Sequence, residues 1–255
     1  MRLLFLGTGT SYGVPMIGCD CDVCRSSDPR DKRTRASVLV KLGGGNVLID
    51  TATELREQAL RNGVTRIDAV LFTHAHADHL HGIDDLRRFS GMQRRRVPVY
   101  GDVKMIAHIR RSHEYIFSDP DFTLGWGIPR LDLKPLDGPV EICGRTVTPV
   151  PIFHGAQTIL GYRIGRLAYL TDCSGIPESS VPLLEGLHTL VLDALRERPH
   201  PTHYSLPEAL AVVERLKPER AYFTHIAHDL AHAATESRLP ENVRMAYDGL
   251  EVETL

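Results

Sequence analysis

The segment Thr73-His74-Ala75-His76-Ala77-Asp78-His79 constrains this chain more than any other part of its sequence. Four side chains that can bind a metal stand within six residues, directly after an apolar run that is typical of a buried strand. His74 and His76 can point together because one residue separates them, whereas the adjacent Asp78 and His79 diverge and could serve two neighbouring ions. Imidazole and carboxylate groups together suit Zn²⁺, Mn²⁺ or Fe²⁺. The sequence therefore predicts a metal site on a loop at a strand end; a polar helix start with incidental histidines is the alternative.

Short β-rich runs bounded by turn residues recur along the chain, and helical patterns lie between some of them. The predicted strands cover residues 2–6, 37–42, 46–50, 69–73, 97–100, 146–153, 159–164, 167–171, 189–193 and 221–224. Gly43-Gly44-Gly45 joins two of these runs as a hairpin. We therefore expect a mostly antiparallel or mixed sheet system with helices outside, and not a repeated parallel βαβ fold.

Two capping-box spacings predict where helices begin. Thr51-Ala52-Thr53-Glu54 opens a helix that stops before Gly63, and Ser205-Leu206-Pro207-Glu208 opens one whose apolar stripe continues to Leu216. Each half of the chain thus leads to a histidine at a strand end. We expect an α/β (α+β) fold, a four-layer αββα sandwich of two similar halves, in one domain over residues 1–255. The stretch 88–135, which contains Arg94-Arg95-Arg96 and Trp126, is the least regular and is expected to form a cover or insertion.

The composition is that of an ordinary globular protein. The 255 residues carry 30 Lys and Arg against 32 Asp and Glu, a net charge of −2, and 42% of them are hydrophobic. This balance disfavours a generic basic nucleic-acid-binding protein, and no apolar run is long enough to span a membrane. Because the first apolar run is too short for a signal-peptide core, we expect a cytoplasmic protein.

Three of the five cysteines crowd into Cys19-Asp20-Cys21-Asp22-Val23-Cys24. In a reducing compartment, such crowding indicates metal binding rather than disulfide bonds. Three thiolates leave a closed structural zinc site one ligand short, so the fourth ligand must come from elsewhere in the chain. A redox-active cysteine pair is the alternative.

The histidine motif resembles the signature of the metallo-β-lactamase fold superfamily, over essentially the whole chain. The resemblance implies a two-ion centre whose later ligands directly follow predicted strands. By that analogy the first ion is held by His74, His76 and His154, the second by Asp78, His79 and His225, and Asp172 bridges the two. The superfamily also gives Asp50 the role of orienting a ligand histidine, because metal-bound imidazoles usually donate their other N–H to a carboxylate or carbonyl.

The cysteine triplet and Thr224-His225-Ile226-Ala227-His228 together resemble a narrower family. This family comprises the phosphodiesterases related to phosphoribosyl 1,2-cyclic phosphate phosphodiesterase of the carbon-phosphorus lyase pathway. The resemblance implies one structural zinc, held by Cys19, Cys21, Cys24 and His228, which ties the N-terminal loop to the loop that carries an active-site ligand. It also points to His203 as a group that contacts phosphate and assists the leaving group. Thr202 and Ser205 stand where the family has Asn and Asp.

The expected function is that of a metal-dependent hydrolase, most specifically a phosphodiesterase that cleaves a small (cyclic) phosphodiester. Two divalent ions, zinc or manganese, would activate the water, with Asp78 and His203 as catalytic groups. The expected partner is the small-molecule substrate, and the oligomeric state is open, a homodimer being among the possibilities. Three alternatives remain: a protein like the pyrroloquinoline quinone biosynthesis protein, another hydrolase of the same fold, and a non-catalytic zinc-binding protein. The complete ligand set favours the enzyme.

Overall fold

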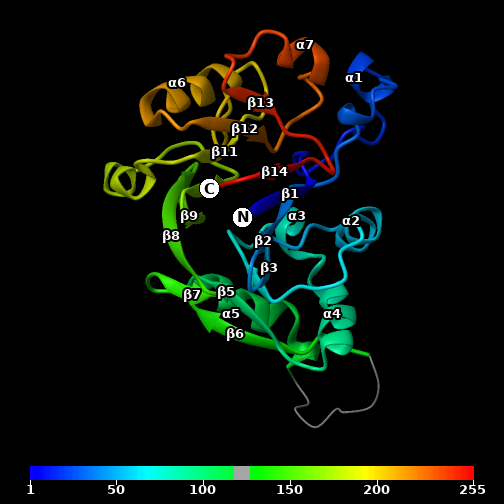
Figure 1. Ribbon diagram of the computed structural model, residues 1–255. Helices are drawn as coiled ribbons and strands as arrows, with labels where there is room; N and C mark the ends of the chain where they lie inside the picture. The colour runs from blue at the N-terminus through cyan, green and yellow to red at the C-terminus, as the bar shows by residue number, and fades with distance from the viewer. Residues whose placement is uncertain (118–126) are drawn as a thin grey trace.

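The computed structural model describes residues 1–117 and 127–255, and within them the strands form two mixed sheets of seven. Figure 1 shows the two sheets with helices on their outer sides. The first sheet has the order β14 (Glu251–Glu253), β1 (Arg2–Gly7), β2 (Ser37–Leu42), β3 (Gly45–Ile49), β4 (Ala69–Leu71), β5 (Val97–Gly101) and β6 (Leu131–Pro135). The second has the order β13 (Val243–Met245), β12 (Arg220–Thr224), β11 (Thr189–Asp193), β10 (Leu167–Leu170), β9 (Gln157–Ile164), β8 (Arg145–His154) and β7 (Val140–Ile142).

The helices are divided between the two sheets. Those associated with the first sheet are α2 (Leu55–Arg61), α3 (Ala77–Leu80), α4 (Leu86–Gln93) and α5 (Val103–Ser112). Those associated with the second are α6 (Leu206–Leu216) and α7 (His232–Glu236). The short helix α1 (Asp22–Arg25) lies in the N-terminal loop. Short 3₁₀ turns cover Pro29–Asp31, Ile83–Asp85, Glu114–Ile116 and Glu178–Leu184. No helix in the described parts of the chain is long and apolar enough to cross a bilayer.

The two halves of the fold repeat one pattern of strand pairing. In the first sheet, the pairs from β14 to β3 are antiparallel and those from β3 to β6 are parallel. In the second sheet, the pairs from β7 to β10 are antiparallel and those from β10 to β13 are parallel. The predicted pair of similar halves with mixed sheets is therefore confirmed. The division is not strictly sequential, because the last strand, β14, returns to pair with β1 beside the N-terminus (Figure 1).

Alternating burial along the strands produces the layers. In β1, Leu3 and Phe5 enter the core between the sheets, whereas Leu4 and Leu6 pack under the helices of the first half. This follows from the period of two along a strand, which sends successive side chains to opposite faces. Three apolar layers, one between the sheets and one under each helical layer, define the predicted four-layer αββα sandwich.

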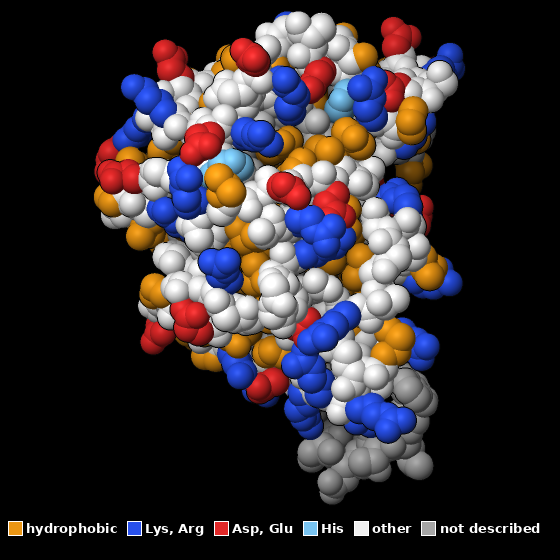
Figure 2. Space-filling view, viewed as in Figure 1, with side chains coloured by type: hydrophobic (Ala, Val, Ile, Leu, Met, Phe, Trp, Pro, Cys, Tyr) orange, Lys and Arg blue, Asp and Glu red, His pale blue; other side chains and the backbone are white. Residues whose placement is uncertain are grey.

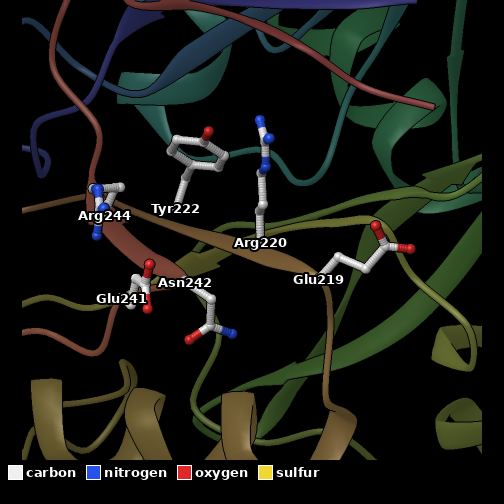
Figure 3. Close-up of a pocket in the computed structure, with 6 residues that line it drawn as sticks. All are labelled: Glu219, Arg220, Tyr222, Glu241, Asn242 and Arg244. Atoms are coloured by element: carbon white, nitrogen blue, oxygen red, sulfur yellow. The ribbon is translucent and has the colours of Figure 1, made fainter.

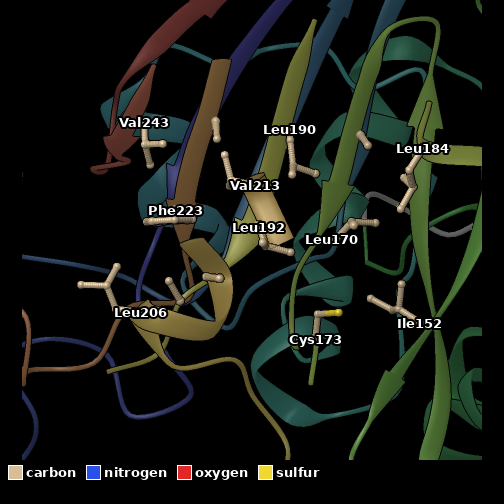
Figure 4. Packing of buried hydrophobic residues seen from close by; sticks show 14 of the residues in the cluster. Ile152, Leu170, Cys173, Leu184, Leu190, Leu192, Leu206, Val213, Phe223 and Val243 are labelled. Carbon is tan, nitrogen blue, oxygen red and sulfur yellow. The ribbon is translucent and has the colours of Figure 1, made fainter. Parts of the chain in front are cut away.

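The outer core of the second half shows how the helical layer is fixed. Leu190, Leu192 and Phe223 project from β11 and β12 toward Leu206 and Val213 of α6 (Figure 4). Full burial of each such side chain contributes about 1.5–3 kcal/mol. The capping box predicted at the start of α6 is present, because Glu208 accepts a hydrogen bond from the backbone N–H of Ser205 at 2.8 Å. The segment that precedes α6 and contains His203 is thereby anchored.

Two predictions of local structure were wrong. The helix predicted from Thr51 begins only at Leu55, because the Thr51 backbone and hydroxyl bond to carbonyls of His79 and Leu80 instead of capping. The stretch 88–135 is not an irregular cover over its described part: it contributes most of α4, then β5, α5 and β6 to the first half. Trp126, and with it the part of that stretch at 118–126, lies outside the described residues.

Candidate metal centre and active site

The candidate ligands gather where the parallel strands of both sheets end. Asp50 follows β3, His74 lies just beyond β4, Asp172 just beyond β10, and His225 follows β12. Three of these residues adopt left-handed backbone conformations, with φ of 61° at Asp50, 54° at Asp172 and 58° at His225. Such conformations are uncommon for residues other than glycine and concentrate at functional sites. They end the strands abruptly at the edge where the site lies.

Two groups of ligand atoms adjoin each other and share one carboxylate. The atoms within each group lie within 4.8 Å of one another. The first group is His74, His76, His154 and Asp172, and the second is Asp78, His79, Asp172 and His225. The structure thus brings together all seven residues of the predicted two-ion centre, from both sheets, with Asp172 in the bridging position.

Several polar atoms that face this centre make no hydrogen bond within the described part of the chain. Nε2 of His74, His79 and His225 and Oδ2 of Asp78 are buried without a hydrogen bond. Leaving such atoms unpaired costs free energy, so native structures rarely do it without a bound ion or water. Imidazole nitrogens and carboxylate oxygens are the donors that zinc and manganese take. The residues therefore fit the divalent metal ions that the predicted fold implies.

Asp50 fixes the tautomers of two of these histidines. Its Oδ2 accepts the Nδ1–H of His79 at 2.7 Å and the hydroxyl of Thr73 at 2.8 Å. Since that hydroxyl donates to Asp50, its oxygen accepts from His74 Nδ1 at 3.0 Å. In the neutral form of both rings the proton is then on Nδ1, and Nε2 is the atom available to a metal. Asp50 therefore occupies the supporting position that the sequence predicts for it.

His154 is oriented by the backbone instead. Its Nδ1 lies 2.9 Å from the carbonyl oxygens of both Asp172 and Thr202. Because a carbonyl only accepts, Nδ1 carries the proton and Nε2 is free to bind a metal. The contact with Thr202 also ties the segment that carries His203 to the first group of ligands.

Carboxylates and histidines inside the cluster shift each other's pKa values. Although burial alone would lower it, the carboxylates of Asp172, Asp78 and Asp50 hold the pKa of His79 well above its ordinary value. Burial opposes ionisation of Asp78 as well, yet His79 and His225 hold its pKa far below the usual range. Burial lowers the pKa of His74, which keeps that ring neutral. The site thus concentrates carboxylate charge where cations bind.

His203 lies beside the cluster, and a residue that sequence reasoning missed supports it. The ring of His203 stacks on that of His225, with centroids 4.8 Å apart, and its Nδ1 lies 3.0 Å from Oδ2 of Asp193. Asp193 is fully buried at the end of β11, between the strands that lead to Asp172 and His225. Its signal in the sequence is an acidic residue closing an apolar run, as Asp50 does.

The cysteine triplet and His228 form a separate cluster. Nδ1 of His228 lies 3.2 Å from Sγ of Cys19, 3.3 Å from that of Cys21 and 3.7 Å from that of Cys24. Tetrahedral bonds of about 2.3 Å to sulfur and about 2.0 Å to nitrogen would separate these atoms by about 3.5 Å. The four side chains fit a closed zinc site, and they come from the predicted residues.

Comparison with known proteins agrees with this geometry. Residues 45–226 match the model of the beta-lactamase superfamily domain. The chain belongs to the metallo-β-lactamase fold superfamily. The crystal structure of a diphosphatase from the PhnP family is similar to it, with 46% identity and a TM-score of 0.92, and the alignment covers 99% of this chain and 97% of that one. The resemblance drawn from the histidine and cysteine motifs is thus confirmed.

Two further relatives define the limits of the comparison. Zn²⁺-bound PqqB from Methylobacterium extorquens shares the metallo-β-lactamase fold, with a TM-score of 0.79 at 20% identity, over 99% of this chain and all of that one. An octanoyltransferase of Porphyromonas gingivalis is 38% identical over 257 residues, which cover 98% of this chain but 51% of that protein. This chain therefore spans about half the length of that curated relative.

Proposed function

We propose that this superfamily member is a metal-dependent phosphodiesterase that cleaves a small (cyclic) phosphodiester with the aid of two divalent metal ions, zinc or manganese. The observation that carries the proposal is the pair of adjoining ligand groups around Asp172, in which several buried inward-facing atoms make no hydrogen bond to the described residues. The similar diphosphatase from the PhnP family supports a phosphorus ester as substrate. Because ligands come from both sheets, we assign residues 1–255 to one catalytic domain.

Each residue has a defined task in this proposal. His74, His76 and His154 would hold one ion, Asp78, His79 and His225 the other, and Asp172 both. Bound there, the two ions would lower the pKa of a shared water and stabilise charge on the phosphate oxygens. Asp50 keeps His79 and His74 in the tautomer that binds metal. Cys19, Cys21, Cys24 and His228 would hold a structural zinc beside the loop that carries His225.

His203 would act on the side of the leaving group. Asp193 accepts its Nδ1–H, so Nε2 is the atom left to contact a phosphate oxygen or the departing alkoxide. Burial and the neighbouring His225 lower the pKa of His203 to about 3, so the free ring is neutral, and a phosphate anion beside it would favour its protonated form. Proton transfer by a positioned histidine typically contributes a factor of about 10² to 10⁴ in rate. Asp193 is thus a positioning residue for His203.

The surface gives little support to a nucleic acid as partner. Figure 2 shows acidic and basic side chains mixed over most of the visible face, with basic groups gathered at its lower end. Of the arginine triplet, Arg95 pairs with Asp68, and Arg96 donates to the carbonyl of Leu131 at 3.1 Å. We therefore propose a small-molecule substrate. We also propose that the protein acts in the cytoplasm and forms a homodimer, which a measurement of its mass in solution would test.

Turnover of bis(4-nitrophenyl) phosphate by protein loaded with Mn²⁺ or Zn²⁺ tests the function. We expect hydrolysis by the wild type and none by Asp78→Ala. Asp84→Ala is the matched control, because Asp84 pairs with Arg87 and Tyr115 outside the ligand groups. Equal rates for Asp78→Ala and the wild type, or no turnover by fully metallated wild type, would overturn the proposal in favour of a non-catalytic zinc protein.

A further inference from the structure

A cavity of about 330 Å³ has His203 among the residues of its walls. Its walls come from the loop after β1, the segment after β11 and the segment after β12. They include Tyr12, Met16, Leu195, Arg196, His203 and Ala227. This volume is within the range of small-molecule sites. Since His203 lines the cavity and stacks on His225 of the candidate centre, a group in the cavity lies near enough to be bonded to a phosphate there.

A larger hollow elsewhere does not share this connection. It has a volume of about 630 Å³ and is lined by Glu219, Arg220, Tyr222, Glu241, Asn242 and Arg244 (Figure 3). Arg220 begins β12, whereas His225 follows the last residue of that strand. The hollow therefore lies at the opposite end of β12 from the candidate site, and the cavity beside His203 is the one that bears on substrate choice.

The chemistry of the walls suits an aromatic heterocycle joined to a sugar. Met16, Leu195 and Ala227 supply apolar surface, and Tyr12 lines the cavity with 72% of its surface exposed. An exposed ring beside an apolar floor offers a face on which a base can stack. The guanidinium of Arg196 is already held by the carbonyls of Arg198 at 3.2 Å and Pro199 at 3.0 Å. It presents a fixed positive charge and further donors to the hydroxyl groups or the phosphate of a ligand.

The wall that carries Tyr12 is held in place before any ligand binds. Val14 exchanges two backbone hydrogen bonds with Arg33, at 2.9 and 2.7 Å. Farther along, the backbone N–H of Met16 donates to Sγ of Cys24 at 3.3 Å, so the cysteine cluster also supports this wall. A pre-organised wall lowers the entropy cost of binding.

We propose that this cavity binds the nucleoside of a nucleoside phosphodiester, with the base on Tyr12 and the nucleoside's ester oxygen facing His203. The proposal rests on the proposed phosphodiesterase function and names its substrate class. In the reaction a water oxygen bonds to phosphorus, and the bond from phosphorus to the nucleoside oxygen breaks. The electron pair stays on that oxygen, which takes one of the two protons of the attacking water, and the other proton stays with the phosphate monoester. The products are the free nucleoside and a phosphate monoester of the other alcohol.

Calorimetric binding to the metal-loaded protein tests the cavity without requiring turnover. The probes are AMP and ribose 5-phosphate, which lacks the base. We expect AMP to bind the wild type about tenfold more tightly than ribose 5-phosphate, the scale of one base stacked on an aromatic ring. Tyr12→Ala should lose this preference and Tyr12→Phe should restore it. Ile17→Ala is the control, because Ile17 lies on the same loop, is 97% exposed and does not line the cavity.

Product analysis tests the orientation. With the methyl ester of AMP as substrate, we expect adenosine and methyl phosphate, because the nucleoside leaves. AMP and methanol as products would contradict the orientation. Equal affinities of the wild type for the two binding probes, or full preference for AMP in Tyr12→Ala, would overturn the cavity assignment. These results differ from failure of the proposed function, in which fully metallated protein would hydrolyse no diester at all.

Discussion

Replacing Asp50 with Asn tests whether the supporting hydrogen bonds set the metal affinity. The substitution keeps the shape of the side chain but exchanges one carboxylate oxygen for an NH₂ group, a donor. Oδ1 accepts from the backbone of Thr73 at 2.8 Å, and Oδ2 accepts from the Thr73 hydroxyl and from His79. With the NH₂ group at the Oδ2 position, His79 faces a donor, and relief requires its proton to move to Nε2. That is the atom that must bind the metal.

The expected loss is about 10- to 100-fold in metal affinity, the range measured when the partner of a metal-bound histidine is removed. It corresponds to about 1.4–2.7 kcal/mol. Competition with a chromogenic chelator measures the dissociation constant in Asp50→Asn, in the wild type and in the control Asp84→Asn. Because the variant has the same volume, its far-UV circular dichroism should match that of the wild type. An unchanged metal dissociation constant in a correctly folded Asp50→Asn variant would refute the reasoning.

Three further predictions address the cysteine cluster, the buried His232 beside Arg33, and the core. Cys21→Ser should lose one tightly bound zinc and melt at a lower temperature, whereas Cys143→Ser, outside the cluster, should keep the full metal content in elemental analysis. Burial and the charge of Arg33 lower the pKa of His232 to about 4. In the unfolded chain His232 binds a proton near pH 6.5, whereas in the folded chain it stays neutral until about pH 4. The stability that the neutral ring contributes is therefore lost as the pH falls through this range. After allowance for solvent screening, chemical denaturation at pH 7 and pH 5 should show the wild type losing about 1 kcal/mol more than His232→Gln; equal losses would contradict this. Leu192→Ala, in the core under α6, should cost about 2–5 kcal/mol in the same assay, and a cost below 1 kcal/mol would mean that the core collapses around the change.

The ligand set was predicted from the resemblance to the superfamily, and the apolar runs that precede His74, His154, Asp172 and His225 agreed with it. Asp172 and His225 stand directly after or close to such runs, and parallel strands bring their ends to one edge. Asp193 ends a run of the same kind but was missed. Its proximity to His203 depends on β11 lying between β10 and β12, a strand order that local sequence does not specify.

The wrong prediction of a helix from Thr51 also results from contacts between residues far apart in the sequence. Thr51 has a capping spacing, but its hydrogen bonds go to residues about 30 positions away, so the helix starts later. The N-cap of α5 is local, because Asp102 accepts from the backbone N–H of Met105 at 2.6 Å, yet this helix was not predicted from the sequence. The pairing of β14 with β1 joins the two ends of the chain and has no local signal.

Reconstitution of metal-stripped protein tests the central claim most directly. Mn²⁺ is added in steps, and elemental analysis of bound metal is compared at each step with turnover of bis(4-nitrophenyl) phosphate. The two ligand groups around Asp172 predict that full activity requires two ions per chain beyond the one that the cysteine cluster holds. Full activity with a single added ion, or turnover by protein that holds none at the histidine site, would contradict the account.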